Sequence, residues 1–238
     1  MNRLVMMVLK NIHVAPAAFA RLWRYAAHLE NYTEMEMWNH IHYIMQRAVM
    51  AGNIDLQVTG LENLPEEDGF MLYANHQGMF DMVAIAATWE RPLAAVLKKE
   101  LGDVPLLKQI RLCTKSFAMD REDVRQSLEV IQNVTKEVQM GRNYLIFPEG
   151  TRSKNGNVMG EFHGGSFRCA VKAKCPIVPV ALLDSHRVLD EKGSAPVKVQ
   201  LHYLQPIPYE EFAGMKATEV AALVKQRIQD AIDAHIEK

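Results

Sequence analysis

Short apolar segments alternate with helical patterns along most of this 238-residue chain, and this alternation restricts the possible folds more than any other feature. Apolar segments of this length, bounded by turn residues, are typical of buried strands. Strands that alternate with helices predict an α/β fold, with a largely parallel sheet flanked by helices. The expected strands are 54–59, 70–74, 93–97, 116–119, 144–147, 177–183 and 197–204.

Three stretches between or around these strands are predicted to be helices. One begins near Glu122 and ends at Gly141, and its apolar residues recur at helical spacing. The last helix covers about 218–236, with a single apolar stripe. The region from about 19 to 50 is expected to be one long helix that stops at Gly52.

The overall composition excludes some classes of partner. The chain is 49% apolar and 23% charged, which is ordinary for a folded domain. Its formal net charge of −1 provides no basic field for nucleic acid, so no nucleic-acid partner is expected. The cysteines Cys113, Cys169 and Cys175 are odd in number and lack C-x-x-C spacing. A disulfide framework is therefore not predicted, and a reducing compartment is the simplest interpretation.

The first 29 residues contain basic residues but no acidic ones. The apolar runs 4–9 and 14–20 are shorter than the roughly 18–20 residues that a spanning helix needs. A basic, apolar helix suits an anionic membrane surface, although it could also pack on the rest of the domain. We therefore expect a helical membrane-docking segment over 1–52 and an α/β domain over 53–238.

The first motif that carries chemistry is Asn75–Asp81, directly after the expected strand 70–74. Residues five apart on one straight helix point about 140° away from each other. His76 and Asp81 can meet if His76 lies in the strand-to-helix loop and Asp81 lies in the first helical turn, which Gly78 facilitates. An imidazole oriented by a carboxylate can then remove a proton from an alcohol. The alternative is an ordinary loop histidine near a helix-start aspartate.

The second motif is Phe147–Ser153, which follows another apolar strand. It combines a carboxylate, a glycine, a hydroxyl and an arginine, and the arginine fork matches the geometry of phosphate. Glu149 could bond substrate hydroxyls or orient the loop. The alternative is a charged surface turn in which Glu149 pairs with Arg152.

Further groups follow other expected strands. Lys98 and Lys99 come after 93–97, and Asp120 and Arg121 come after 116–119. They could supply positive charge to an anionic ligand, or they could be solvated lysines and a helix-start aspartate. The backbone N–H groups of Gly164 and Gly165 could lie near an anion or a developing oxyanion, or the glycines could only allow the chain to turn.

Several other chemistries lack support in the sequence. There is no nucleotide phosphate loop and no G-x-S-x-G nucleophile elbow, and no cysteine has the context of a nucleophile. Direct attack by a bound alcohol on an acyl donor fits better than a covalent acyl-enzyme. The pair His40 and His42 resembles a metal site but lacks a suitably spaced acid. No metal and no cofactor are predicted.

Four segments, taken in order, resemble the blocks of the glycerolipid acyltransferase family. The likeness covers about 54–204 and is greatest to the bacterial 1-acyl-sn-glycerol-3-phosphate acyltransferases. The segments are Asn75-His76-x₄-Asp81, Phe117-x-x-Asp120-Arg121, Phe147–Ser153 and Val178-Pro179-Val180.

The resemblance implies a reaction and a site. His76 would deprotonate the sn-2 hydroxyl of lysophosphatidic acid, with Asp81 as its orienting partner, and the hydroxyl would attack the thioester of acyl-CoA or acyl-carrier protein. The product would be phosphatidic acid, and the family associates Pro179 with the acyl-binding wall. The implied substrate-binding residues are Lys98, Arg121, Glu149, Gly150, Thr151 and Arg152.

The resemblance also implies a location and leaves alternatives. The expected location is the cytoplasmic face of the cell membrane, as a peripheral or monotopic protein. The acceptor could instead be glycerol-3-phosphate, another lysolipid or an amine-containing lipid. A non-catalytic lipid-binding protein of the same fold and a His/Asp metal-dependent hydrolase are the rival classes.

Two departures from the family pattern bear on acceptor preference more than on catalysis. Gly78 stands where a serine is frequent in the first block. Thr114 and Lys115 stand where the second block usually opens with glycine.

Overall fold

The computed structural model describes residues 2–236, so Met1, Glu237 and Lys238 of the two expected segments lie outside it. Within these residues a seven-stranded sheet has the order β1-β7-β6-β2-β5-β3-β4. Neighbouring strands are parallel except β6 and β7, which are antiparallel. The α/β class with a mostly parallel sheet is confirmed. The strands are β1 (Ile54–Thr59), β2 (Met71–Ala74), β3 (Leu93–Lys98), β4 (Phe117–Met119), β5 (Asn143–Ile146), β6 (Ile177–Leu183) and β7 (Val197–Tyr203).

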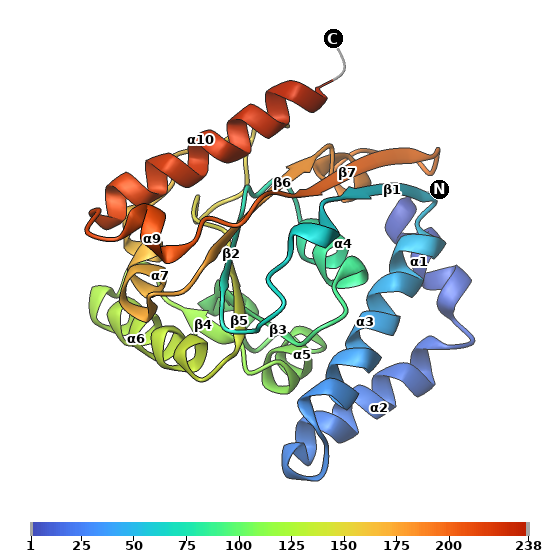
Figure 1. Cartoon of the computed structure of the whole chain (residues 1–238). Coiled ribbons are helices and arrows are strands. Elements are labelled where there is room, and N and C mark those ends of the chain that lie inside the picture. The colour runs from blue at the N-terminus through green and yellow to red at the C-terminus, as the bar shows by residue number, and fades with distance from the viewer. Residues whose placement is uncertain (1, 237–238) are drawn as a thin grey trace.

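Helices cover both faces of the sheet (Figure 1). One face carries α1 (Arg3–Asn11), α2 (Ala15–Ala27), α3 (Glu34–Ala51) and α4 (Asp81–Thr88), whereas the other carries α6 (Val124–Gln139), α7 (Arg168–Ala173) and α10 (Ala217–His235). The shorter elements are α5 (Leu107–Cys113), α8 (His186–Leu189), α9 (Tyr209–Phe212) and the 3-10 turns η1 (Leu29–Asn31), η2 (Leu61–Asn63), η3 (Lys99–Leu101) and η4 (Gly164–Phe167).

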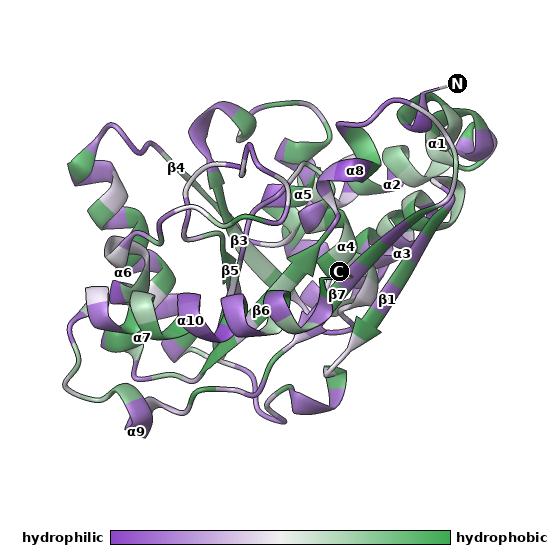
Figure 2. Cartoon of the chain, turned by 90° about the horizontal axis from the view of Figure 1, so that it is seen from above, coloured by the Kyte–Doolittle hydropathy of each residue, from purple (hydrophilic) through white to green (hydrophobic). Residues whose placement is uncertain are grey.

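The central strands are buried on both faces. In β2, Met71 and Tyr73 join the core beneath α6, α7 and α10, while Leu72 and Ala74 join the core beneath α1–α4. This explains why these strands are continuous apolar runs rather than alternating ones. Figure 2 shows the result, with hydrophobic strands such as β3, β5 and β6 inside and hydrophilic residues along α10.

The predicted single helix over 19–50 is wrong. It is two helices, α2 and α3, separated by the turn η1. Thr33 begins α3 with a capping box, because its hydroxyl accepts from the Glu36 N–H and the Glu36 carboxylate accepts from the Thr33 N–H. The T-x-x-E pattern at 33–36 is a sequence signal for this break that the periodicity of the region concealed.

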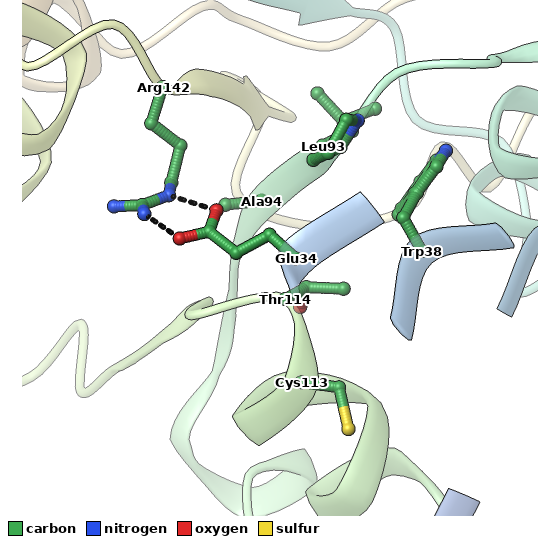
Figure 3. Close-up of a pocket in the computed structure, with 8 residues that line it drawn as sticks. Glu34, Trp38, Leu93, Ala94, Cys113, Thr114 and Arg142 are labelled. Carbon is green, nitrogen blue, oxygen red and sulfur yellow. Dashed lines mark hydrogen bonds and ion pairs between the residues drawn. The ribbon is translucent and has the colours of Figure 1, made fainter. Parts of the chain in front are cut away.

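The helix α3 is packed firmly on the rest of the molecule. The Trp38 indole donates to the Trp89 carbonyl at 3.0 Å, and the ring Nδ1 of His42 lies 2.8 Å from the Ala86 carbonyl. At the start of α3, Glu34 accepts from Arg142 beside a small cavity of about 10 Å³ (Figure 3). His40 contacts the Ala18 carbonyl of α2 instead, so His40 and His42 bond to carbonyls of different elements.

The helices α1 and α2 form the basic, apolar part of the N-terminal region. Among the described residues, each helix taken alone falls short of the length or the hydropathy needed to cross a membrane. Only α1 and α2 taken together meet those criteria, and they are bent by 86° at their junction.

Candidate active site

His76 and Asp81 lie in the connection between β2 and α4. His76 is in the loop, Asp81 is the first residue of α4, and the distance between His76 Nδ1 and Asp81 Oδ2 is 2.6 Å. Because the carboxylate accepts, we assign the ring proton to Nδ1, which leaves the lone pair on Nε2. The imidazole also stacks on the Phe147 ring, with 4.3 Å between the ring centroids, and the His76 side chain remains 22% exposed. The predicted contact between the two side chains is present, and its geometry is what a general base and its orienting carboxylate require; the catalytic roles stay a prediction.

The Asp81 side chain is completely buried, and both its oxygens accept hydrogen bonds. Oδ2 accepts from the Gln77 and Gly78 N–H groups at 2.6 and 3.0 Å, and Oδ1 accepts from the Ser185 hydroxyl. Glycine is favoured at 78 because a Cβ there would lie 3.0 Å from the His186 Cα, so that the neighbouring backbone would have to shift. That close approach gives a steric reason for the departure from the family pattern.

The Phe147–Ser153 loop is tied to the same histidine. Glu149 Oε1 accepts from the His76 N–H, and Oε2 accepts from the Gly160 N–H, both at 2.7 Å. The Ser153 N–H donates to the His76 carbonyl at 2.8 Å. Glu149 is buried, and this burial raises the pKa of its carboxyl. With both oxygens engaged by backbone donors, Glu149 orients the loop, and its contact with substrate stays a prediction.

Arg121 follows β4 and leans against the same loop. A Cβ placed on Gly150 would lie 3.6 Å from Arg121 Nη1 and 3.4 Å from the His163 ring, and the φ of Gly150 is +70°. Desolvation lowers the pKa of Arg121. The left-handed backbone favours glycine at 150, whereas the distance to the guanidinium is an ordinary van der Waals contact that shows only that Arg121 lies beside the loop.

The predicted cations differ in their partners. Lys98 pairs with Glu100 at 2.9 Å, and Arg152 pairs with Asp190 at 3.8 Å rather than with Glu149. Arg121 is the exception, since no acid among residues 2–236 lies within ion-pair distance of it. The Arg121 side chain is exposed, and Glu100, which pairs with Lys98, attracts it only from beyond ion-pair distance. An exposed guanidinium without an ion-pair partner is well suited to an anionic ligand.

The remaining predicted residues are less tightly placed. Thr151 is exposed at the surface of the loop. Gly164 is needed for packing, because a Cβ there would lie 3.0 Å from the Thr218 Cα at the start of α10. That contact favours the structural interpretation of Gly164 over an oxyanion role.

Sequence reasoning missed Gln77 and Ser185. Gln77 Oε1 accepts from the Ser185 N–H at 2.9 Å, and Gln77 Nε2 donates to Asn157 at 2.7 Å. Gln77 lies inside the first motif, but a glutamine in a loop carries no signal of its own. Ser185 is more than a hundred residues away from Asp81 and follows β6, where the sequence shows only a buried strand.

Comparison with known proteins identifies the class to which this fold and site belong. A family model described as Acyltransferase matches residues 55–183, which is more than half of the chain. The chain therefore belongs to the acyltransferase family, a class of group-transfer enzymes.

Particular relatives share this family and fold. The 1-acyl-sn-glycerol-3-phosphate acyltransferase of Pseudomonas aeruginosa is 34% identical over 66% of this chain and 58% of its own length. The protein of the same name from Saccharomyces cerevisiae is 26% identical over 86% of this chain and 67% of its own length. The crystal structure of the 1-acyl-sn-glycerophosphate acyltransferase PlsC from Thermotoga maritima aligns with a TM-score of 0.78 at 20% identity. That alignment covers 98% of this chain and 97% of the other, which shows a shared fold.

Proposed function

We propose that this protein transfers a fatty acyl group from acyl-CoA or acyl-carrier protein to the sn-2 hydroxyl of lysophosphatidic acid, giving phosphatidic acid. One observation carries the proposal. His76 contacts Asp81 at 2.6 Å, its N–H is bonded to Glu149 of the Phe147–Ser153 loop, and Arg121 lies against Gly150 of that loop with no acid within ion-pair distance. This supports a base near an anion-binding group. The names of several bacterial relatives agree with this acceptor.

The proposed reaction contains two proton transfers. Nε2 of His76 takes the proton of the acceptor hydroxyl as its oxygen attacks the thioester carbonyl carbon. The tetrahedral intermediate collapses with cleavage of the C–S bond, and the imidazolium returns the proton to the leaving thiolate. Asp81 stabilises the imidazolium between these steps. Such a base typically contributes about 10²–10⁴-fold to the rate.

The acceptor phosphate would be held by Arg121, with Arg152 and Lys98 at the rim. A hydrogen bond to a charged group contributes about 1.5–3 kcal/mol, and a buried acyl chain adds about 0.8 kcal/mol for each CH₂. A lysolipid has both a phosphate and an acyl chain, so these two interactions can position its hydroxyl beside His76 before reaction.

We also propose that α1 docks on the cytoplasmic face of a membrane, as part of a peripheral or monotopic protein. One side of α1 packs inward through Met6 and Met7, whereas its other side and the next residue form an exposed apolar surface. An interfacial helix buries such a surface among lipid headgroups and acyl chains. The exposed residues are Leu4, Val5, Val8, Leu9 and Ile12, which are 47–62% exposed.

The reaction is tested by assaying the purified protein with lysophosphatidic acid, glycerol-3-phosphate and a neutral lysolipid, each with acyl-CoA and with acyl-carrier protein. We expect phosphatidic acid from the first acceptor and at least tenfold less product from the others. Substituting His76→Ala should reduce transfer by about 10²–10⁴-fold, and the exposed His28→Ala should not. Preference for another acceptor would contradict the proposed substrate, and normal turnover of His76→Ala would contradict the base.

The docking surface is tested by sedimentation with vesicles that contain anionic lipid. A Val8→Asp/Ile12→Asp variant should lose most vesicle binding, because each charge must enter the interface. The matched control, Met140→Asp/Val158→Asp, alters residues that are equally exposed on other elements. Equal binding of the two variants would rule out α1 as the docking element.

A further inference from the structure

The Ser185 hydroxyl is a buried polar group of the site that no sequence motif identified. Ser185 is fully buried in the turn between β6 and α8, on a segment remote in sequence from both the dyad and the Phe147–Ser153 loop. Its Oγ lies within hydrogen-bond distance of Asp81 Oδ1 and 3.2 Å from Gln77 Oε1. A fully buried hydroxyl against the orienting carboxylate of a proposed catalytic pair requires a functional explanation.

The direction of this hydrogen bond can be worked out from the neighbours. A serine hydroxyl has one proton to donate. Gln77 Oε1 already accepts from the Ser185 N–H at 2.9 Å, and it is farther from the hydroxyl than Asp81 Oδ1 is. The proton therefore goes to Asp81, whose two oxygens are then divided. Oδ2 faces the His76 ring, and Oδ1 faces Ser185.

We propose that Ser185 is a positioning residue that fixes the rotation and the charge distribution of the Asp81 carboxylate, so that His76 is held as a base. This inference rests on the proposed acyl transfer and deepens it. Backbone N–H groups hold Oδ2, and Gly78 also reaches Oδ1 at 3.1 Å, but Ser185 supplies the side-chain donor to Oδ1. Without it, the carboxylate gains freedom to turn about its own axis and keeps more charge on the oxygen that faces the imidazole.

Ser185 is itself held from two sides. Its N–H is bonded to Gln77, which is anchored in turn to Asn157 at 2.7 Å. The helix α8 begins directly after Ser185, and the buried guanidinium of Arg3 donates to the carbonyls of Arg187 and Val188 at 3.2 and 2.8 Å. Carbonyls in the last turn of a helix lack partners within the helix, so Arg3 fixes the segment that carries Ser185.

The test compares Ser185→Ala with Ser185→Cys, in which the thiol is a weak donor of similar size. We expect kcat to fall about tenfold in Ser185→Ala, which is a fraction of the ~10²–10⁴-fold that the base itself contributes, and to fall less in Ser185→Cys. The KM values for both substrates should stay within about twofold. The acidic limb of the kcat/KM–pH profile should move to higher pH, because a carboxylate with one donor fewer binds the imidazolium more strongly.

A second readout does not depend on activity. The pH midpoint of the His76 ring, followed by NMR in the whole protein, should rise in Ser185→Ala. The buried control Thr135→Val removes a hydroxyl that bonds only within α6, so it should lower stability without moving that midpoint. Glu149, which interacts electrostatically with both His76 and Asp81, is unchanged in these variants, and His186 borders Gly78 in all of them.

The outcomes separate this inference from the proposed reaction. A wild-type protein that acylates no acceptor would overturn the proposed function, while the NMR titration would still decide the role of Ser185. An unchanged His76 midpoint in Ser185→Ala would overturn the positioning role. The positioning role would also be overturned if kcat fell equally in Thr135→Val and Ser185→Ala and the kcat/KM–pH profile did not shift. If Ser185→Ala fails to fold, Ser185→Cys is judged by the same midpoint.

Discussion

At the dyad, the Asp81 side chain is completely buried and accepts hydrogen bonds on both oxygens, whereas the cationic side chains of the same site lie at the surface. Lys98 and Arg152 are 55% and 48% exposed, and each is paired with an acid that a bound phosphate would have to replace. The proposed base is therefore organised before any substrate arrives. The proposed headgroup contacts, in contrast, would have to be exchanged on binding, so we expect the buried dyad to determine the rate and the surface cations to determine the preference among acceptors.

The largest effect that would test this contrast is expected from Asp81→Asn. The amide would present a donor to groups that already donate, and it would orient the imidazole in the wrong tautomer. We expect kcat to fall by about 10²–10⁴-fold with little change in the acceptor KM. Steady-state kinetics beside circular dichroism measures this. A raised KM with normal kcat would mean that the dyad is not organised in advance.

The next effect concerns Arg121→Ala. This substitution removes the unpaired guanidinium, so the acceptor KM should rise by about 10–100-fold, as expected for a charge-assisted hydrogen bond of about 1.5–3 kcal/mol. The control Arg125→Ala alters an exposed arginine on α6. Equal KM values for the two variants would remove Arg121 from the phosphate site.

A smaller change in the acceptor KM is expected for Arg152. Because Arg152 pairs with Asp190, substituting each partner should change the KM in opposite directions. Arg152→Ala should raise the acceptor KM by only a few-fold, because exposed ion pairs contribute about 0–1 kcal/mol. Asp190→Ala should lower the KM slightly, because it releases Arg152 from its partner. If both variants raise the KM equally, Arg152 and Asp190 act as one structural pair rather than as competitors.

The smallest effect concerns the pH dependence of stability that Glu149 causes, since Glu149 links the Phe147–Ser153 loop to His76. Burial raises the pKa of Glu149, so between the ordinary carboxyl pKa and this raised value the folded state binds more protons than the unfolded state. The contribution of Glu149 to the free energy of unfolding should therefore decline as pH rises through that range. Urea unfolding of the wild type and Glu149→Gln from pH 4 to pH 7 measures it, and the variant should lose less stability with rising pH. Parallel curves would contradict the sign.

The parts of the fold that the sequence predicted well are those that depend on local pattern. Apolar runs located the central strands to within a residue or two because these strands are buried on both faces, and alternation located the edge strand β1. The break between α2 and α3 was missed, since it depends on a capping box rather than on periodicity. The antiparallel direction of β7 beside β6 was missed too, because strand direction depends on how the chain returns rather than on composition.

The site shows the same division between local and distant information. The motif containing His76 and Asp81 could be found because five residues bring the two groups into one loop. The sequence could not show which cations lack an ion-pair partner. Lys98 and Arg152 are paired because Glu100 and Asp190 lie near them in the folded chain. The contacts of Ser185 and Arg3 join segments more than a hundred residues apart, and a single serine or arginine gives no sign of such a partner.

Arg3 donates to the carbonyls of Gly52, Val188 and Ala195 as well as Arg187, and it belongs to the same helix that exposes the apolar surface. Through two of these hydrogen bonds α1 is joined to α8, which begins directly after Ser185. We therefore expect a displacement of α1, such as the proposed insertion among lipids, to disturb the turn that carries Ser185 and the Asp81 carboxylate that this turn contacts. Replacing Arg3 would remove that connection.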